Sequence, residues 1–152
     1  WEFGSWLGDL FKSGFSIQPS VLHRDDTTLL AYRQKVSAWE SRVIISKITP
    51  EITLSKVLIA DDFTPPDMIE LADGRIVITW GQRKPPYGIK AKISNNFGES
   101  WSGDITIRNT GHCMNLGYNR SVQRSDYKIL TTYYTHDDPD GERYIGYSIW
   151  EI

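Results

Sequence analysis

The chain has 152 residues, of which 39% are hydrophobic and 24% charged. This composition is typical of a globular domain with its own core, and it excludes a disordered or collagen-like chain. The formal charge of −2 lacks the clustered positive charge that nucleic-acid and anionic-membrane surfaces need, so neither partner is expected. No window approaches the roughly 18 apolar residues that span a bilayer, and no signal-peptide pattern is present. The sequence predicts a soluble chain and leaves its compartment open.

Aromatic residues make up 12% of the chain, among Gly, Pro, Ser, Thr and Val/Ile runs, which favours β-strands. Residues 1–15 are interpreted as an N-terminal arm, and residues 16–152 as three copies of one unit. Each copy starts with an apolar run, a turn on an aspartate and a second apolar run, which predicts a β-hairpin. The hairpins at 19–32, 66–79 and 119–132 align without gaps and place these turn aspartates in one column: Asp26, Asp73 and Asp126.

A third strand that ends in serine follows each hairpin, at 42–46, 90–94 and 144–148. A fourth strand follows twice, at 56–59 and 104–107, and the third copy reaches Ile152 without one. Four strands per unit of about 48 residues are typical of a β-propeller blade. The expected fold class is therefore all-β, with three four-stranded antiparallel sheets that form half of a six-bladed propeller. The blades are predicted near 16–60, 61–108 and 112–152.

A motif lies at the predicted turn between the third and fourth strands of the second unit. Ser94-Asn95-Asn96-Phe97-Gly98-Glu99-Ser100-Trp101 resembles the Asp-box, Ser-x-Asp-x-Gly-x-x-Trp, of sialidases and related repeat proteins, with Asn96 replacing the aspartate. The first unit has a degenerate copy that begins at Ser46. Together with the segments 72–77, 85–89 and 116–121, the box makes residues 16–152 look like the C-terminal half of a sialidase-like protein. The box implies fold more than function, because it lies opposite that family's active site.

In a propeller, the loops that enter the inner strands share one face with the loops that join the second and third strands. The candidate site residues on these loops are Gln18, Arg33, Asp67, Arg83, Lys84, Tyr87, Tyr118, Arg120 and 134–140. The resemblance implies a tyrosine nucleophile activated by a glutamate, with arginines that clamp a carboxylate on the substrate. By its place in the motif, Tyr118 resembles the nucleophile, and Arg33, Arg83 and Arg120 are candidates for the clamp.

Each candidate has a structural alternative. Tyr118 could pack or stack, Arg33 and Arg120 could pair with carboxylates of neighbouring blades, and Asp67 is either a general acid or a turn acceptor. No glutamate matches the family's base, and its Arg-Ile-Pro element has no counterpart here. The expected function is a sialidase-like glycoside hydrolase, or its C-terminal half, acting on an acidic terminal sugar. The alternatives are a glycan-binding module that uses Tyr87, Tyr118 and Tyr133, and a purely structural half-propeller.

No metal or cofactor is expected. His23, His112 and His136 are scattered, Cys113 lacks ligand partners at zinc spacing, and 137–141 lacks the distal glutamate of a calcium loop. Three blades cannot close a ring, so a homodimer that completes the propeller is the expected assembly. In that dimer, residues 1–7 or 11–15 would supply the missing fourth strand of the third sheet.

Overall fold

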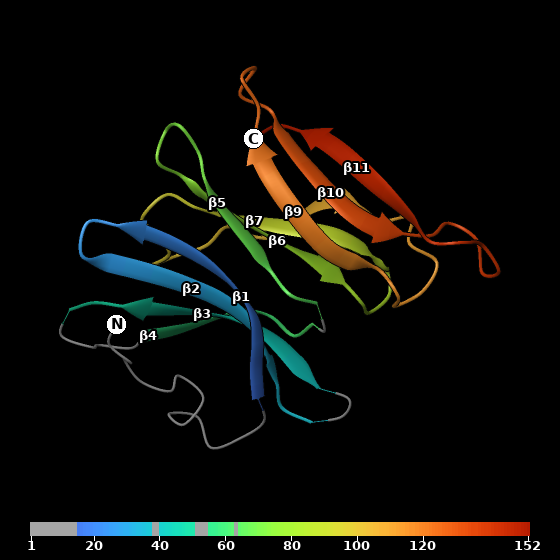
Figure 1. The fold of residues 1–152 in the computed structure, drawn as a ribbon, viewed down its shortest axis with the longest axis horizontal. Coiled ribbons are helices and arrows are strands. Elements are labelled where there is room, and N and C mark those ends of the chain that lie inside the picture. Colours follow the sequence, from blue (N-terminus) through green and yellow to red (C-terminus); the bar gives the residue numbers. More distant parts are fainter. Residues whose placement is uncertain (1–14, 38–39, 51–54, 63) are drawn as a thin grey trace, which may run out of the picture.

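The computed structural model describes residues 15–37, 40–50, 55–62 and 64–152, whose strands form three antiparallel sheets (Figure 1). The first sheet contains β1 (Phe15–Arg24), β2 (Thr27–Lys35), β3 (Ser41–Ile48) and β4 (Ser55–Ala60). The second contains β5 (Asp67–Glu70), β6 (Ile76–Gln82), β7 (Gly88–Ser94) and β8 (Ile105–Arg108). The third contains β9 (Gly117–Gln123), β10 (Ile129–Thr135) and β11 (Tyr144–Trp150).

The all-β prediction with successive antiparallel sheets is confirmed. In each sheet the strands follow one another in chain order, and β5 lies between β1 and β9, so the sheets fan out from these inner strands as propeller blades do (Figure 1). The third sheet differs from the expected four strands, because it has three among the described residues. Of the two segments expected as a fourth strand, 1–7 and 11–15, all but Phe15 lie outside the described part of the chain, and Phe15 begins β1.

Alternate residues of the strands fill the spaces between neighbouring sheets. Leu29 and Ile45 of the first sheet pack against Ile76, Ile78 and Trp80 of the second, and all five are almost fully buried. The other face of the second sheet packs on the third through a cluster of Leu71, Val77, Ala91, Ile93 and Ile129. Successive side chains of a strand point to opposite faces, so the same strands of the second sheet pack against the first sheet on one face and against the third on the other.

None of the described residues belongs to a helix with the length and apolar character that crossing a membrane would require.

A repeated hydrogen bond joins the inner strands of neighbouring blades. Ser20 Oγ on β1 accepts from the Met68 backbone N–H on β5 at 2.9 Å. Asp67 Oδ2 on β5 accepts from the Ser121 backbone N–H on β9 at 2.7 Å. Ser20 and Asp67 occupy the same column of the sequence repeat, so one position provides the acceptor between the first and second blades and again between the second and third.

The gapless hairpin alignment holds between the second and third units and slips by one residue in the first. Asp67 pairs with Thr79 and Arg120 with Thr132, but Ser20 pairs with Ala31, where the alignment predicted residue 32. The reason is turn length, because Arg24 pairs directly with Thr27 around a two-residue turn. The other hairpins close by longer turns.

The aspartate column is therefore structurally equivalent in two of its three members. Asp73 Oδ1 accepts from the Arg75 backbone N–H at 3.0 Å, and Asp126 Oδ1 accepts from the Lys128 N–H at 3.4 Å. Asp26 lies in the shorter turn and does not fill this place. The serines that end the third strands also differ in their pairing. Ser94 pairs with the first residue of β6, whereas Ser148 pairs with the third residue of β10. A slip of two residues keeps every side chain on its face.

The Asp-box forms a closed turn after β7. Ser94 Oγ accepts from the Gly98 N–H at 2.8 Å, and Asn96 Oδ1 accepts from the Ser100 N–H at 2.9 Å. Asn96 thus makes the backbone contact expected of the aspartate it replaces. Trp101 packs against the core between the first two blades.

One face of the third sheet is open and apolar. Val122, Ile145, Tyr147 and Ile149 lie on it with exposures of 53%, 76%, 67% and 44%. By strand register, these positions correspond to the buried face through which the second sheet packs on the third. The third sheet therefore presents the kind of surface that a propeller blade offers to its neighbour.

Candidate functional site

Arg33, Arg83, Tyr118 and Tyr134 come together at the end of the blades where the inner strands begin. Tyr118 has a φ of 50°, and Gln18, which occupies the same column of the repeat, has a φ of 58°. In both sheets the register between the inner and second strand shifts next to this residue. A positive φ is uncommon for residues other than glycine, and such conformations concentrate at functional sites. The repeat thus bends its inner strand at one point and places Tyr118 there, half exposed.

A close backbone approach holds this bend against the second blade. A Cβ on Gly81 would lie 2.9 Å from the Gly117 Cα, so only glycine allows β6 and β9 to come so near at this point. The buried Thr64 hydroxyl donates to the Gly81 carbonyl and accepts from its N–H, both at 2.7 Å. Tyr118 is therefore carried on well-fixed backbone.

Arg83 is anchored in the cluster from three sides. Its Nε donates to the Leu116 carbonyl at 2.9 Å, its Nη2 donates to the Tyr134 hydroxyl at 2.9 Å, and its backbone N–H donates to Asp62 Oδ1 at 2.8 Å. The guanidinium carbon lies 5.7 Å from the centre of the Tyr118 ring, a cation–π distance. These contacts fix the plane of the guanidinium and leave three of its five N–H donors outside them.

Arg33 brings a second cation to the same place. Its pKa is lowered, first because burial desolvates the guanidinium and then because of the like charge of Arg83, while Tyr118 acts in the opposite direction. Two neighbouring guanidiniums form a place that suits an anion, because an opposite charge is attracted to both. The sequence predicted these two arginines as clamp residues, and the structure brings both to Tyr118.

Tyr134 completes the cluster from β10. Its ring centre lies 5.7 Å from that of Tyr118. The amide of Asn115 is assigned with Oδ1 accepting from Arg143 Nη2 at 2.9 Å and Nε at 3.0 Å, because the opposite orientation sets its NH2 against the guanidinium. Asn115 Nδ2 then donates to the Tyr134 hydroxyl at 2.8 Å. The hydroxyl oxygen accepts from both Arg83 and Asn115, so its own hydrogen can be donated to a ligand.

The sequence reasoning missed Asn115 and Arg143. Both lie on loops of the face where the site was expected, Asn115 on the loop entering β9 and Arg143 on the loop before β11. Asn115 has no motif of its own, and Arg143 lies three residues beyond the stretch 134–140. Their role depends on a contact between two loops, which no local pattern indicates.

Asp67 and Arg120 form an ion pair between neighbouring blades. Arg120 Nη1 donates to Asp67 Oδ1 at 3.1 Å, with Arg120 exposed and Asp67 buried. Burial raises the pKa of Asp67, while the Ser121 N–H and the charge of Arg120 lower it in part. For Arg120, the alternative of a neighbouring-blade carboxylate is therefore the contact observed. Asp67 has its two oxygens on blade-to-blade bonds, and any general-acid role for it remains a prediction.

The raised pKa of Asp67 predicts a specific pH dependence of stability. Folding favours the protonated carboxyl, so its contribution is complete below the unfolded-state pKa and is lost as the pH rises through the higher folded-state value. We expect the unfolding free energy of wild type relative to Asp67→Asn to decline from about pH 4 upward. Chemical denaturation across this range measures the difference. A difference that does not change with pH would contradict the assignment. Asp126→Asn is a control of opposite sign, because the hydrogen bond from Arg124 lowers the pKa of Asp126 and its contribution should be lost as the pH falls.

The remaining candidates lie apart from the cluster or have other contacts. Lys84 is exposed on the loop before β7, and its carbonyl accepts from Gln82 Nε2 at 3.2 Å. Tyr87 packs on the core cluster of Ile89, Leu116 and Tyr133. Tyr133, considered for glycan stacking, is 2% exposed, and its hydroxyl bonds to Ser148 Oγ at 2.7 Å. Of these two rings, that of Tyr118 is exposed and that of Tyr133 is buried.

The stretch 134–140 divides between several contacts. Asp137 accepts from Arg108 Nη2 at 2.5 Å and from the Tyr144 hydroxyl. These bonds, the one from Tyr144 first, lower the pKa of Asp137. Within the described ranges, no three His, Cys, Asp or Glu side chains are grouped as metal ligands.

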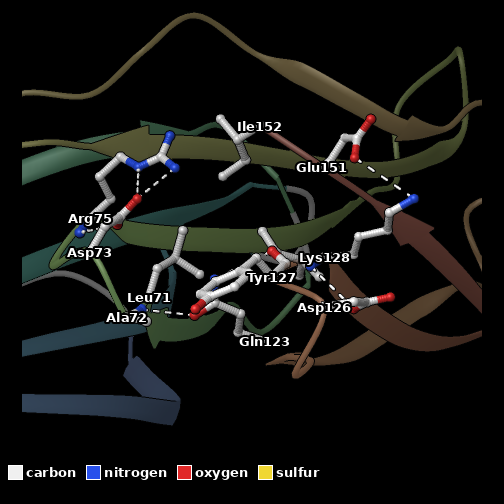
Figure 2. Close-up of a pocket in the computed structure, with 11 residues that line it drawn as sticks. Leu71, Ala72, Asp73, Arg75, Gln123, Asp126, Tyr127, Lys128, Glu151 and Ile152 are labelled. Carbon is white, nitrogen blue, oxygen red and sulfur yellow. Dashed lines mark hydrogen bonds and ion pairs between the residues drawn. The ribbon is translucent and has the colours of Figure 1, made fainter.

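A hollow of about 500 Å³ lies at the opposite end of the blades, between the second and third sheets (Figure 2). Its polar groups bond mainly to one another. Arg75 pairs with Asp73 at 2.7 Å, Lys128 with Glu151 at 3.8 Å, and the Ala72 N–H donates to Gln123 Oε1 at 2.8 Å. The hollow therefore has the character of a packing groove between blades, and the arginine–tyrosine cluster is the better candidate site.

Comparisons with solved structures agree with this architecture. A protein of unknown function from Dyadobacter fermentans aligns with a TM-score of 0.78 and 24% identity, over 93% of this chain and 39% of that one. A xylan beta-1,4-xylosidase from Bacillus halodurans aligns with a TM-score of 0.59 and 16% identity, over 90% of this chain and 31% of that one. A proposed glycoside hydrolase from Parabacteroides distasonis aligns with a TM-score of 0.51 and 13% identity, over 88% of this chain and 53% of that one.

No family model matches the sequence, and no curated protein matches it. The chain spans between about a third and a half of the length of the three solved proteins. At these identities the likeness concerns the fold. The chain thus has an all-β fold of successive antiparallel sheets that is distantly similar in structure to parts of glycoside hydrolases.

Proposed function

We propose that this chain binds an acidic terminal sugar through Arg33 and Arg83 and forms the C-terminal half of a sialidase-like glycoside hydrolase site. The observation that carries the proposal is the pair of guanidiniums beside a half-exposed tyrosine at the bend of an inner strand. Guanidinium groups bind carboxylates through two parallel charge-assisted bonds, which suits a sugar acid better than a neutral sugar. The hydrogen of the Tyr134 hydroxyl adds a further donor to the same region.

Tyr118 is the proposed nucleophile, because its place in the motif resembles that of the family nucleophile and its half-exposed ring lies beside Arg83. A phenol can approach an anionic substrate without the repulsion that a second carboxylate would cause. Turnover also requires a base, and the described contacts of Tyr118 are with Arg83 and Tyr134. We therefore expect this chain to bind by itself and to turn over substrate only where further blades supply the base.

Binding by the isolated chain tests the proposal with two matched ligands. The methyl glycoside of N-acetylneuraminic acid carries the carboxylate, and its methyl ester has the same shape without the charge. Titration by NMR or calorimetry should show the acid binding at least about tenfold more tightly, a difference of ~1.4 kcal/mol. Equal affinity for the two, or no binding of the acid, would overturn the proposal.

A glycan-binding module without turnover is the second candidate function, favoured by the anchored and already paired state of the cluster. The Tyr118→Phe variant separates the two functions, because it keeps the ring and removes the nucleophile. If the site is catalytic in the full protein, hydrolysis of a fluorogenic sialoside should be lost while binding of the acid persists. Equal hydrolysis by wild type and variant would exclude Tyr118 as nucleophile.

We also propose that a second copy of the chain covers the open face of the third sheet. The face carries large apolar side chains, among which Ile145 and Tyr147 are 76% and 67% exposed. Light scattering at micromolar concentration should give a mass above the 17.5 kDa of one chain, and Tyr147→Lys should reduce it. A strictly monomeric wild type would contradict this assembly.

A further inference from the structure

The loops beside the candidate site bring a cysteine and a histidine into direct contact. Cys113, on the loop that enters β9, has its Sγ 3.0 Å from Nε2 of His136, which follows β10. Cys113 is half-buried, whereas His136 is only 2% exposed. Cys113 is thus partly exposed while its partner is shielded from water.

The surroundings determine which nitrogen of His136 carries the proton. Nδ1 lies 3.0 Å from the Asp138 carbonyl oxygen, which can only accept, so Nδ1 holds the hydrogen and donates it there. Nε2 is then the basic nitrogen and accepts from the Cys113 S–H. The backbone N–H of Asn115 points to the same sulfur at 3.4 Å and favours negative charge on it.

We propose that Cys113 is a reactive thiol, with His136 as its general base, that takes up peroxides and soft electrophiles. The three parts are those of an activated nucleophile: a thiol, a base within hydrogen-bond reach, and a third group that orients the base. The proton moves from Sγ to Nε2, and the thiolate attacks. With hydrogen peroxide, an S–O bond forms and the O–O bond breaks, giving a sulfenic acid, and the leaving hydroxide takes the proton to become water.

This modification site lies next to the arginine–tyrosine cluster. Asn115, whose N–H contacts the sulfur, also bonds to the Tyr134 hydroxyl through its side chain, and Tyr134 is two residues from His136. An oxygen or alkyl group on Sγ would occupy the space where Asn115 now approaches. Modification of Cys113 therefore has a direct structural route to the donors of the proposed sugar site, although its chemistry does not depend on that function.

The chain contains a single cysteine, so reaction with iodoacetamide followed by mass spectrometry reports on Cys113 alone. At neutral pH the folded wild type should react roughly tenfold or more faster than the same chain unfolded in guanidinium, where the base is lost. His136→Gln should remove this acceleration. His112→Gln is the matched control, because His112 is exposed, precedes Cys113, and has its ring 6.2 Å from that of His136.

Two results would overturn the proposal. One is a folded wild type that reacts no faster than the unfolded chain, a comparison that stands even if His136→Gln fails to fold. The other is a folded His136→Gln variant, verified by its thermal transition, that keeps the wild-type rate. Trapping of a sulfenic acid with dimedone after peroxide treatment should likewise succeed in wild type and fail in the folded His136→Gln variant.

Discussion

Gly88→Ala should destabilise the fold more than an alanine substitution at any other glycine that the structure describes. A Cβ at this position would lie 1.9 Å from the Arg108 carbonyl oxygen and 2.8 Å from its carbon, both of them backbone atoms. Real structures do not tolerate such contacts, so the pairing of β7 with β8 next to Ile89 must open. We expect a loss of about 3 kcal/mol or more in the unfolding free energy.

Gly103→Ala is the control for this substitution, because a Cβ added at residue 103 would have no nonadjacent residue within 4 Å. Urea denaturation of the two variants and wild type measures the difference. Gly103→Ala should stay close to wild type, and a Gly88→Ala variant of the same stability would show that β8 does not approach β7 as described. Arg108 also bonds to Asp137, so the Gly88 variant should further loosen the loop before β11.

Arg83→Met should weaken binding of the acidic sugar by roughly ten- to a hundredfold, since hydrogen bonds to charged groups contribute about 1.5–3 kcal/mol. Methionine keeps most of the apolar stem and removes the guanidinium that lies beside Tyr118. Tyr134 should also be held less firmly, because its hydroxyl loses the hydrogen bond from Arg83 and keeps only Asn115 as its partner. Arg83→Lys keeps the charge without the planar guanidinium, so its affinity for the acidic sugar should lie between those of wild type and Arg83→Met.

Arg124→Met is the matched control for net charge. Arg124 lies in the hairpin at the other end of the third blade, where its Nε bonds to Asp126 Oδ1 at 3.0 Å. Both substitutions remove one positive charge, so a general electrostatic effect would weaken binding equally. Calorimetric titration with the sugar acid should show loss for Arg83→Met alone, and equal losses would indicate nonspecific attraction instead of a site.

The strands and the order of the sheets could be predicted from the sequence because the signals are local. Alternating apolar residues and turn aspartates indicated each hairpin, and Ser94 to Trp101 indicated the turn after β7. The pairing register of the strands was harder to predict from the sequence. A gapless alignment could not reveal that the Asp25–Asp26 turn is shorter than its counterparts, because one residue lost in a turn leaves the apolar pattern of the flanking strands intact.

The candidate site was predicted in part for a related reason. Arg33, Arg83 and Tyr118 were found because propeller topology assigns their loops to one face. The contact between Cys113 and His136 was not found, because each residue is isolated in sequence and the two meet only through the approach of two loops. Arg120 was expected at a ligand or at a carboxylate, and only the packing of β5 against β9 puts Asp67 within its reach.

The acceptor that joins successive inner strands changes its chemistry at the third repeat. Ser20 and Asp67 each receive an N–H from the strand that follows, but the third residue of this series is Arg120, whose side chain can only donate and already turns back to Asp67. The series therefore has a direction and an end. A strand that adjoins β9 on its outer side therefore finds no side-chain acceptor at this position for the N–H that Ser20 and Asp67 receive at the two earlier junctions, and that N–H has to be satisfied in another way.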